Sequence, residues 1–576
     1  MAEAVENPRN TELTRLDELV GRLREGAKSW VKLPVAQKAA VARRMLEGFS
    51  RVSERSVRAA VAAKGITPGT PQEGEEWLSG PYVTLRILRL TAEALEDVAA
   101  GRNPPIGKVD RTIDGKLRVQ VYPMTTLDKL LFGGLTAETI LEAGATEKDL
   151  EGRAKFYKKG PDFDAAQGRV ALILGAGNVN SIPPTDVVTK MFSEGKVCIL
   201  KMNPVNAYVG PFIEEAFKEL IEKNWLAVVY GGAEEGSYLC KHAGVDEIHI
   251  TGSDKTHDSI VWGPPGKERA ERMARNQPIL DKEITSELGN VSPVLVVPGP
   301  YSAGELAFQA DNIGGQVTNN ASFNCNAAKM LITPKGWSRT DELFTGLEKA
   351  IGAAPVRKAW YPGAKDRYQQ LTSGHSNVVK IGNAPEGSLP WTLVKGLDAS
   401  DHDERNFTTE PFCSIISQTE VASDDPVAFL EQAVEFANNR LWGTLSACVV
   451  VHPKTLKDPK VQAAFDNAIA KLRYGAIGIN IWPAIAFVLG GTPWGAHPGS
   501  TLTNIQSGRG FVHNTSMLEK IEKCVCRYPV TGFPNPKLPY FPTHKNAHVL
   551  GRKLTAFEPS QSWLQLPGIV GSAMKG

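Results

Sequence analysis

Hydrophobic and polar residues alternate along the chain in patterns that change from one stretch to the next. In the first hundred residues, the apolar positions recur three and four apart, as they do in residues 82–101, and this spacing predicts amphipathic helices. Residues 115–124 have the apolar alternation of a strand. The polar stretch 125–168 is broken by Gly and Pro, which predicts an insertion or a connection.

From residue 169 to 252, continuous apolar strands alternate with helices of about ten or more residues, beginning with "RVALILGAG" and ending with "DEIHITGS". This order predicts a buried parallel sheet with helices on its faces, a doubly wound nucleotide-binding domain. Ligands of such domains bind beyond the carboxyl ends of the strands.

A second α/β section follows the first. Its predicted strands are 292–299, 329–335, 412–420, 446–452 and 474–482, with helices at 427–439 and 457–472. The predicted fold class is therefore α/β, with a doubly wound nucleotide-binding domain followed by an α/β catalytic domain. No internal repeat or low-complexity tract interrupts this plan.

Composition narrows the classes of function. The 576 residues, 42% apolar and 22% charged, are typical of a globular protein of two or three domains. Lys and Arg number 65 against 63 Asp and Glu, so no basic field for nucleic acid or an anionic membrane is indicated. Because there is no leader-like segment and no apolar run of about 18 residues, we expect a cytoplasmic enzyme without a membrane span.

The seven cysteines are too few and too scattered for a disulfide framework, and their odd number leaves at least one thiol free. Cys524 and Cys526 lie two residues apart, but no second Cys or His pair has zinc-finger spacing around them. The ten histidines show no H-E-x-x-H pattern. We therefore expect no metal site and reduced cysteines, among which a reactive thiol is allowed.

The ends of the predicted strands carry the candidate binding residues. "GAGNVN", residues 175–180, approaches the dinucleotide fingerprint but lacks its last glycine, and Lys201 ends the second strand where an acidic residue is usual. Lys201 can bond ribose hydroxyls or a 2′-phosphate, or it can be a solvated strand-end lysine. Gly252 and Ser253 begin a predicted helix, where backbone N–H groups can hold a pyrophosphate, although the sequence is equally an ordinary N-cap.

Glu287 and Cys325 are the candidate catalytic residues. Glu287 precedes a Gly289-Asn290 turn and a buried strand, where partial desolvation would suit a general base, although an exposed loop glutamate is the commoner case. Cys325 lies in "TNNASFNCNAAKMLIT", where a buried, inert cysteine is the ordinary interpretation of the residue taken alone.

The order and spacing of these residues resemble the aldehyde dehydrogenase superfamily, from about residue 169 to 510. The family's catalytic asparagine, counted back from Lys201, corresponds to Asn178, and its T-G-S segment resembles residues 251–253. The matches continue in the family's order. Glu287-Leu288-Gly289 resembles its E-L-G-G segment, and Asn320 lies five residues before Cys325, as an asparagine does before the family's nucleophile. Glu410-Pro411-Phe412 resembles its E-x-F segment, and residues 437–445 resemble its A-N-x-x-x-G-L segment.

The resemblance implies a mechanism and a role for each residue. Cys325 would attack the aldehyde carbon, Asn178 and the Cys325 backbone N–H would hold the oxyanion, and Glu287 would activate the water that hydrolyses the thioester. The resemblance also implies binding of NAD or NADP by Lys201, Gly252, Ser253, Glu410 and Phe412. It further implies homodimers or homotetramers built by strand addition.

Departures from the family's pattern indicate a divergent member. Ser322-Phe323 replace the Gly-Gln pair before the nucleophile, Asn290 replaces a glycine after the base, and Gly177 replaces the Trp before the asparagine. NAD-preferring members carry a Glu three residues after the strand-end lysine, whereas this chain has Pro204, which permits NADP.

Two alternatives to hydrolytic aldehyde oxidation stay open at this point. One is a reductase of the same fold that transfers the acyl group between the cysteine and coenzyme A, and the other is a catalytically silent scaffold. Retention of Cys325, Asn178 and Glu287 together favours an enzyme, and a water-activating Glu287 favours hydrolysis.

The substrate and the domain limits follow from the same pattern. Trp482, Ile485 and Phe487 match the family's substrate entrance and favour an apolar aldehyde as the small-molecule substrate, although they fit a core or an interface equally well. The predicted domains are 1–283 with the insertion, a catalytic domain at 284–510, and a tail at 511–576 that is a candidate oligomerisation element.

Overall fold

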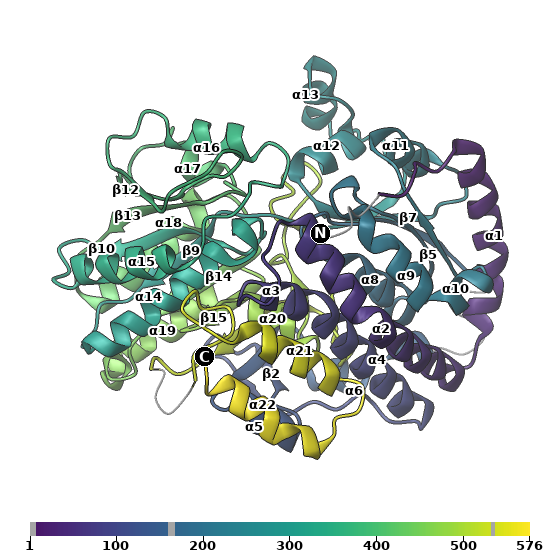
Figure 1. Cartoon of the computed structure of the whole chain (residues 1–576), viewed down its shortest axis with the longest axis horizontal. Helices are drawn as coiled ribbons and strands as arrows, with labels where there is room; N and C mark the ends of the chain where they lie inside the picture. Colours follow the sequence, from purple (N-terminus) through teal and green to yellow (C-terminus); the bar gives the residue numbers. More distant parts are fainter. Residues whose placement is uncertain (1–6, 159–167, 532–535) are drawn as a thin grey trace.

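The computed structural model describes residues 7–158, 168–531 and 536–576 (Figure 1). One of its two large sheets has six strands in the order β17-β8-β7-β4-β5-β6. Its five long strands run parallel, and only the short β17 is antiparallel to its neighbour β8. Their bounds are β4 (Val170–Leu174), β5 (Val197–Lys201), β6 (Leu226–Val229), β7 (Glu247–Gly252), β8 (Glu283–Leu288) and β17 (Gly508–Arg509). The predicted doubly wound domain is confirmed.

Helices cover both faces of this sheet, as the predicted alternation requires. Those in the connections are α8 (Ile182–Val188), α9 (Gly210–Ala216), α10 (Lys218–Glu222), α11 (Ala233–Lys241), α12 (Asp254–Trp262) and α13 (Lys267–Ala274). The N-terminal residues form helices as predicted, α1 (Leu13–Lys32), α2 (Val35–Ala63), α3 (Glu73–Trp77) and α4 (Val83–Ala99). In Figure 1, α1 and α2 (purple) flank this sheet, and α1 contacts β4, β5 and β6.

The second sheet has eleven strands in the order β1-β2-β3-β19-β15-β14-β9-β10-β13-β12-β11. Its central strands are parallel and mainly apolar, because helices cover both of their faces. These strands are β9 (Ser292–Val296), β10 (Ala328–Pro334), β13 (Ile415–Val421), β14 (Ser446–Val450) and β15 (Ala476–Ile479). The covering helices include α14 (Ala303–Thr318), α15 (Thr340–Ala353), α18 (Pro426–Arg440) and α19 (Pro459–Lys471). At the far edge lie β12 (Trp391–Leu397) and β11 (Val378–Ile381).

Residues 125–168 were expected to form an insertion or a connection, but β3 (Thr136–Leu141) within them is an inner strand of the eleven-stranded sheet. It pairs with β2 (Leu117–Tyr122) and with β19 (Ile521–Arg527), both antiparallel. β19 also pairs in parallel with β15 of the same chain. These strands, with the short β1 (Val109–Arg111), are therefore joined to the catalytic sheet within one chain.

The end of the chain packs onto the N-terminal helices. α21 (Ala547–Phe557) contacts α3, and α22 (Leu566–Ala573) follows it, both in yellow at the base of Figure 1. The buried carboxylate of Glu558 accepts hydrogen bonds from Arg86 and Arg89 of α4. No helix in the described part of the chain is long and apolar enough to cross a membrane.

Candidate active site

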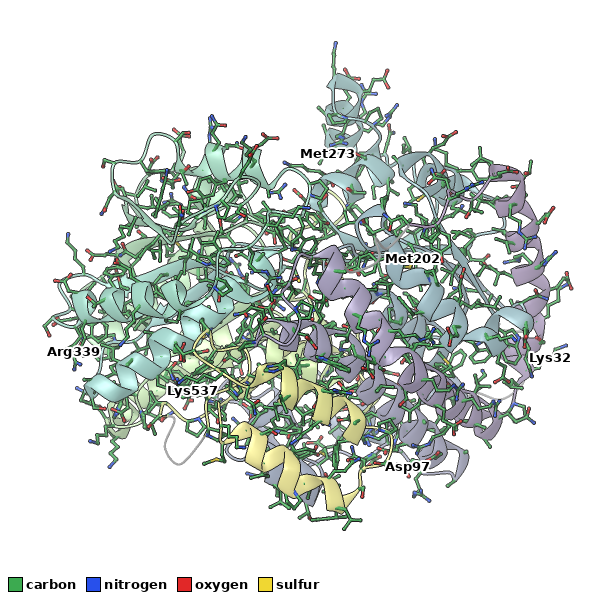
Figure 2. The ribbon with its side chains drawn as sticks, in the orientation of Figure 1. Lys32, Asp97, Met202, Met273, Arg339 and Lys537 are labelled. Carbon is green, nitrogen blue, oxygen red and sulfur yellow. The ribbon has the colours of Figure 1, made fainter. Side chains whose placement is uncertain are left out.

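A cavity of about 1080 Å³ lies where the carboxyl ends of the nucleotide-domain strands face the catalytic sheet. The eight residues assigned to catalysis and cofactor binding in the sequence all line it, although they come from both sheets and from positions more than 200 residues apart. They are Asn178, Lys201, Gly252, Ser253, Glu287, Cys325, Glu410 and Phe412. Met202, labelled in Figure 2, marks the end of β5, where Lys201 enters the cavity.

Cys325 is distinguished from the other cysteines by its position. All seven are free thiols, and Cys325 alone is partly exposed while the other six are buried. Burial, and the nearby charges of Glu287 and Glu410, raise the pKa of the Cys325 thiol well above its usual value. The thiol therefore needs a neighbouring base in order to become a nucleophile.

The loop before Cys325 has an uncommon backbone. Asn320, Ala321 and Ser322 have φ values of 53°, 54° and 68°, a left-handed run without glycine that only strong local contacts can hold. The side-chain amide of Asn320 supplies such contacts, since it donates to the backbone carbonyls of Asn178 at 3.0 Å and Phe323 at 3.2 Å. This residue thus ties the cysteine loop to the loop that carries Asn178.

Lys64 supports the same junction, although no sequence motif singles it out. Its ammonium group is buried and donates to Glu76 at 2.8 Å, to Asn320 Oδ1 at 3.0 Å and to the Asn178 carbonyl at 3.2 Å. It also lies 5.0 Å from the centre of the Trp360 ring. Because Lys64 follows a long amphipathic helix, its sequence position is that of any solvated helix-end lysine.

Asn178 lies at the boundary of the cavity. Its side-chain amide donates to the Phe323 carbonyl at 2.9 Å, which fixes its orientation beside the cysteine loop. A primary amide has two N–H donors, so one more is available to a ligand oxygen.

Glu287 is the penultimate residue of β8 and is 4% exposed, so the alternative of an exposed loop glutamate is wrong. Trp494 donates to its Oε1 at 2.6 Å, and the Cys325 sulfur lies 4.0 Å from the same oxygen. Its Oε2 has no hydrogen-bond partner among the described residues. Burial first, and then the negative charge of Asp186, raise the pKa of Glu287 to about 8. A carboxyl group in this state can exchange a proton near neutral pH.

Lys201, Gly252 and Ser253 form the nucleotide-domain wall of the cavity. Lys201 is only 7% exposed, which excludes the solvated strand-end lysine, and burial lowers its pKa. Ser253 is the N-cap of α12, where its hydroxyl oxygen accepts from the Thr256 N–H at 3.2 Å. The side chain of Ser253 is therefore occupied by the helix.

Glu410 and Phe412 form part of the opposite wall. Burial raises the pKa of Glu410 to about 8, and the positive charge of Lys329 opposes this shift. Glu410 Oε1 has no partner in the described chain, and a Cβ on Gly289 would lie 2.1 Å from it, so a larger residue at 289 would displace this carboxyl group. Phe412 packs edge-on against Tyr361, 4.8 Å between ring centres.

Lys329 is a second buried lysine that no sequence motif singles out. It lies inside β10, 1% exposed, and donates to the Ser322 hydroxyl at 2.8 Å and to the Cys413 carbonyl at 3.3 Å. Burial lowers its pKa to about 8. It anchors the cysteine loop from the side of the catalytic sheet.

Residues 480–491, matched to a substrate entrance, lie outside the lining of this cavity. Trp482 and Phe487 are buried, and Trp482 donates to the carbonyl of Asn326, next to Cys325, at 2.8 Å. Its ring lies 5.3 Å from that of Tyr540 in the C-terminal segment. The contacts favour the core interpretation for Trp482 and Phe487.

Cys524 and Cys526 lie in the interior of the eleven-stranded sheet. Both are buried in β19, and Cys524 donates to the Pro493 carbonyl at 3.0 Å. Within residues 7–158, 168–531 and 536–576, no cluster of three or more His, Cys, Asp or Glu side chains is arranged to hold a metal ion.

Comparison with known proteins gives matches to aldehyde dehydrogenases in sequence and in fold. Residues 182–365 match the model of the aldehyde dehydrogenase family. A 4-trimethylaminobutyraldehyde dehydrogenase of Oryzias latipes is 32% identical over 103 residues, 18% of each chain. A geranial dehydrogenase of Castellaniella defragrans is 27% identical over 236 residues, 38% of this chain and 43% of the other. The matches thus span less than half the length of these curated relatives.

The fold extends much further than the sequence match. The Mycobacterium tuberculosis aldehyde dehydrogenase complexed with NAD⁺ superimposes with a TM-score of 0.58 at 18% identity, over 90% of this chain and 91% of the other. An NADP complex of glyceraldehyde-3-phosphate dehydrogenase from Bacillus halodurans gives 0.58 at 16% identity, over 90% and 92%. The predicted aldehyde dehydrogenase-like fold and the resemblance of a divergent chain to that family are confirmed.

Proposed function

We propose that this chain, a divergent relative of the aldehyde dehydrogenases, oxidises an aldehyde to a carboxylic acid with NAD or NADP. One observation carries the proposal: a thiol, a carboxyl and an amide line the same cavity, with the Cys325 sulfur 4.0 Å from Glu287 Oε1. These are the nucleophile, the base and an oxyanion donor that acyl chemistry on a cysteine requires.

The first half of the reaction uses the thiol and its neighbour. Glu287 accepts the proton of the Cys325 thiol, and the sulfur attacks the aldehyde carbon to form a thiohemiacetal. The oxyanion accepts hydrogen bonds from the second N–H of the Asn178 amide and from the Cys325 backbone. The nicotinamide nucleotide, when bound, supplies the hydride acceptor, and the cysteine then carries a thioester.

The second half uses the base again. Glu287 passes on its first proton and, once ionised, removes a proton from the water that attacks the thioester carbon. The sulfur leaves as thiolate and takes up the proton of the new carboxylic acid, so the thiol is restored and the carboxylate is released. Because the pKa of Glu287 is raised to about 8, the carboxylate is a far better proton acceptor here than an exposed glutamate would be.

The cavity suits a nicotinamide dinucleotide. Glu410 Oε1 is a buried acceptor without a partner in the described residues, as a ribose hydroxyl would require. Lys201, Lys241 and Lys255 line the nucleotide side, and Pro204 stands where a carboxylate would repel a 2′-phosphate. Both NAD and NADP therefore fit this wall.

The partner would be a small-molecule aldehyde. A preference for apolar aldehydes rests only on the matched segment, residues 480–491, in which Ile485 is half-buried. Assembly into a homodimer or homotetramer is part of the same proposal, and so is a cytoplasmic location. Within one chain, β19 already lies between β3 and β15, so strand addition would have to use the sheet edges at β1 or β11.

The test is absorbance at 340 nm with a panel of short and long aldehydes and with NAD or NADP in turn. Reduced cofactor is expected with the wild type, none with Cys325→Ala, and a single, slower burst with Glu287→Gln, in which the thiol has to give its proton to water. Signal that appears only after coenzyme A is added would replace hydrolysis with acyl transfer to the thiol. Silence under both conditions would contradict the proposal and favour a scaffold.

A further inference from the structure

A buried ion pair from the N-terminal helices contacts the two loops that carry Asn178 and Cys325. Lys64 is the C-cap of α2, and Glu76 belongs to α3. Their side chains are 3% and 1% exposed, and Lys64 Nζ lies 2.8 Å and 3.1 Å from the two carboxylate oxygens. Burying two charges has a desolvation cost that their attraction seldom exceeds. The further contacts of this pair therefore indicate its role better than the pairing itself does.

Lys64 contacts both loops at once. Its ammonium group donates to the backbone carbonyl of Asn178 at 3.2 Å and to Asn320 Oδ1 at 3.0 Å. A lysine ammonium has three N–H donors, and the third faces Glu76, so each of them has an acceptor. The ring of Trp360, 5.0 Å from Nζ, favours the charged form. Lys64 lies outside the lining of the cavity, so it acts on a ligand only through the residues that it holds.

Glu76 holds the Asn178 loop at a second point. Asn180 Nδ2 donates to Glu76 Oε2 at 3.4 Å, and Asn180 Oδ1 accepts a hydrogen bond from the Tyr208 hydroxyl at 3.3 Å. The loop is thus fixed by Lys64 at the Asn178 carbonyl and by Glu76 at the Asn180 side chain. One ion pair therefore restrains the backbone on either side of the Asn178 side chain.

Asn320 connects the ion pair to the Asn178 amide. Because Lys64 donates to its Oδ1, the amide nitrogen of Asn320 faces the other way, toward the carbonyls of Asn178 at 3.0 Å and Phe323 at 3.2 Å. The Phe323 carbonyl also accepts from the Asn178 side chain at 2.9 Å. Asn320 has a φ of 53°, a left-handed conformation that is costly without such contacts. A continuous path of hydrogen bonds thus runs from Lys64 to the Asn178 side chain.

We propose that the Lys64–Glu76 pair positions the Asn178 amide as an oxyanion donor opposite Cys325, an inference that rests on the proposed aldehyde oxidation. The amide and the thiol lie on different loops, and they can act on one carbonyl group only if the two loops keep a fixed distance. A displacement of about 1 Å in such a site can lower the rate about a hundredfold. Lys64 and Glu76 are positioning residues, since they set the geometry of Asn178 without lining the cavity.

The test is a double-mutant cycle of Lys64→Met with Asn178→Ala, with Lys523→Met as the matched control. Lys523 of β19 is also fully buried and donates to three backbone carbonyls at 2.6 to 3.2 Å, and it too lies outside the lining of the cavity. The measurements are the rate at which reduced cofactor forms with enzyme in excess over aldehyde, the KM for the cofactor, and the free energy of unfolding.

The expected result is a rate lowered about tenfold to a hundredfold by Lys64→Met when Asn178 is present, because the donor is then misplaced. In the Asn178→Ala background the same substitution should change the rate by less than about threefold, because the donor that it positions is absent. The KM for the cofactor should stay within about twofold in both, since the nucleotide wall is untouched. Lys523→Met should lower the free energy of unfolding and leave the rate of the folded protein unchanged.

Two results would overturn the proposal. A loss of rate of the same size with and without Asn178 would leave Lys64 a general structural role. A rate of Lys64→Met within about twofold of the wild type would show that the Asn178 amide keeps its place without the ion pair.

Glu76→Gln is the second variant in case Lys64→Met does not fold. The amide keeps the shape of the side chain but replaces one of its two acceptor oxygens with a donor, so Lys64 and Asn180 can no longer both be satisfied. The rate should fall about threefold or more, and this loss should also disappear in the Asn178→Ala background. If the wild type forms no reduced cofactor, the proposed function fails. An active wild type in which neither loss depends on Asn178 contradicts only the role of the ion pair.

Discussion

The two sheets that meet at the active site are both buried and largely parallel, but they differ in what their central strands carry. In the catalytic sheet, β9 and β14 present apolar side chains such as Val294, Leu295 and Val449 to both faces. In the nucleotide-binding sheet, one face of β7 and β8 carries carboxylates, a histidine and threonines.

The two kinds of strand contribute differently to the stability of the protein and to its chemistry. An apolar strand contributes free energy of folding through burial, whereas every buried polar group has a desolvation cost that hydrogen bonds only partly recover. Glu287 even retains an oxygen without a partner in the described structure. The nucleotide-binding sheet therefore carries polar groups that are unfavourable for folding, next to the cysteine that we propose to be the nucleophile.

The largest expected effect is that of Glu287→Gln. The amide cannot accept a proton, so steady-state turnover should fall about a hundredfold to ten-thousandfold. One burst of reduced cofactor should still form, more slowly than in the wild type, because the thiol then gives its proton to water. Stopped-flow absorbance at 340 nm measures both phases. Glu283→Gln, at the exposed start of the same strand, is the matched control and should keep wild-type turnover. Equal turnover in both variants would contradict the role of Glu287.

A core substitution in the catalytic sheet should lower the stability of the protein and leave its chemistry unchanged. Leu295→Ala removes a fully buried side chain from β9 and should lower the free energy of unfolding by about 2 to 5 kcal/mol. The kcat of the folded fraction and its pH profile should remain those of the wild type. Urea unfolding and activity measured on the same samples check this. A shifted pH profile of kcat would contradict the proposal that the catalytic sheet contributes stability while the polar face of the other sheet contributes to the chemistry.

The stability of the wild type should depend on pH through Glu287. Its pKa is raised from 4.5 to about 8 in the folded protein, so the native state holds a proton that the unfolded state has lost between these values. Stability from this group is full below pH 4.5 and is lost as pH rises through about 8. The Glu287→Gln variant has no proton to lose at this position. Its free energy of unfolding should therefore exceed that of the wild type by an amount that grows with pH to a few kcal/mol, on the order set by the pKa shift. Thermal unfolding at pH 5, 7 and 9 measures it, and a constant difference would contradict the assignment.

The smallest expected effect concerns the cofactor. Pro204→Glu places a carboxylate near the ribose position and should raise the KM for NADP relative to that for NAD by about tenfold, through charge repulsion and ribose bonding. Pro204→Gln is the uncharged control and should leave the ratio within about twofold. The KM values for both cofactors decide the outcome, and an unchanged ratio in the glutamate variant would place the ribose elsewhere.

Much of this architecture is predictable from the sequence because it depends on local patterns. Apolar runs of strand length between helical segments specify both sheets, and residues at strand ends, such as Lys201, converge because parallel strands share an edge. β3 was not assigned to a sheet, since its segment is polar and its neighbour β19 is almost 400 residues away.

The environment of the site residues was not predictable in the same way. Glu287 has the sequence context of a loop residue, yet it is a buried strand residue because Trp494 and the adjoining sheet cover it. Lys64 and Lys329 have the sequence context of a helix-end lysine and a strand lysine, and only the three-dimensional packing places both against the cysteine loop. Burial and partner choice are set by long-range contacts that the local pattern does not contain.

The most direct test of the central claim is mass spectrometry of Glu287→Gln after incubation with aldehyde and oxidised cofactor. If Cys325 is the nucleophile and Glu287 the base for hydrolysis, the protein should gain the mass of one acyl group, and the peptide containing Cys325 should carry it. Cys325→Ala in the same background should gain nothing. Reduced cofactor formed without any adduct, or an adduct on another residue, would contradict the account.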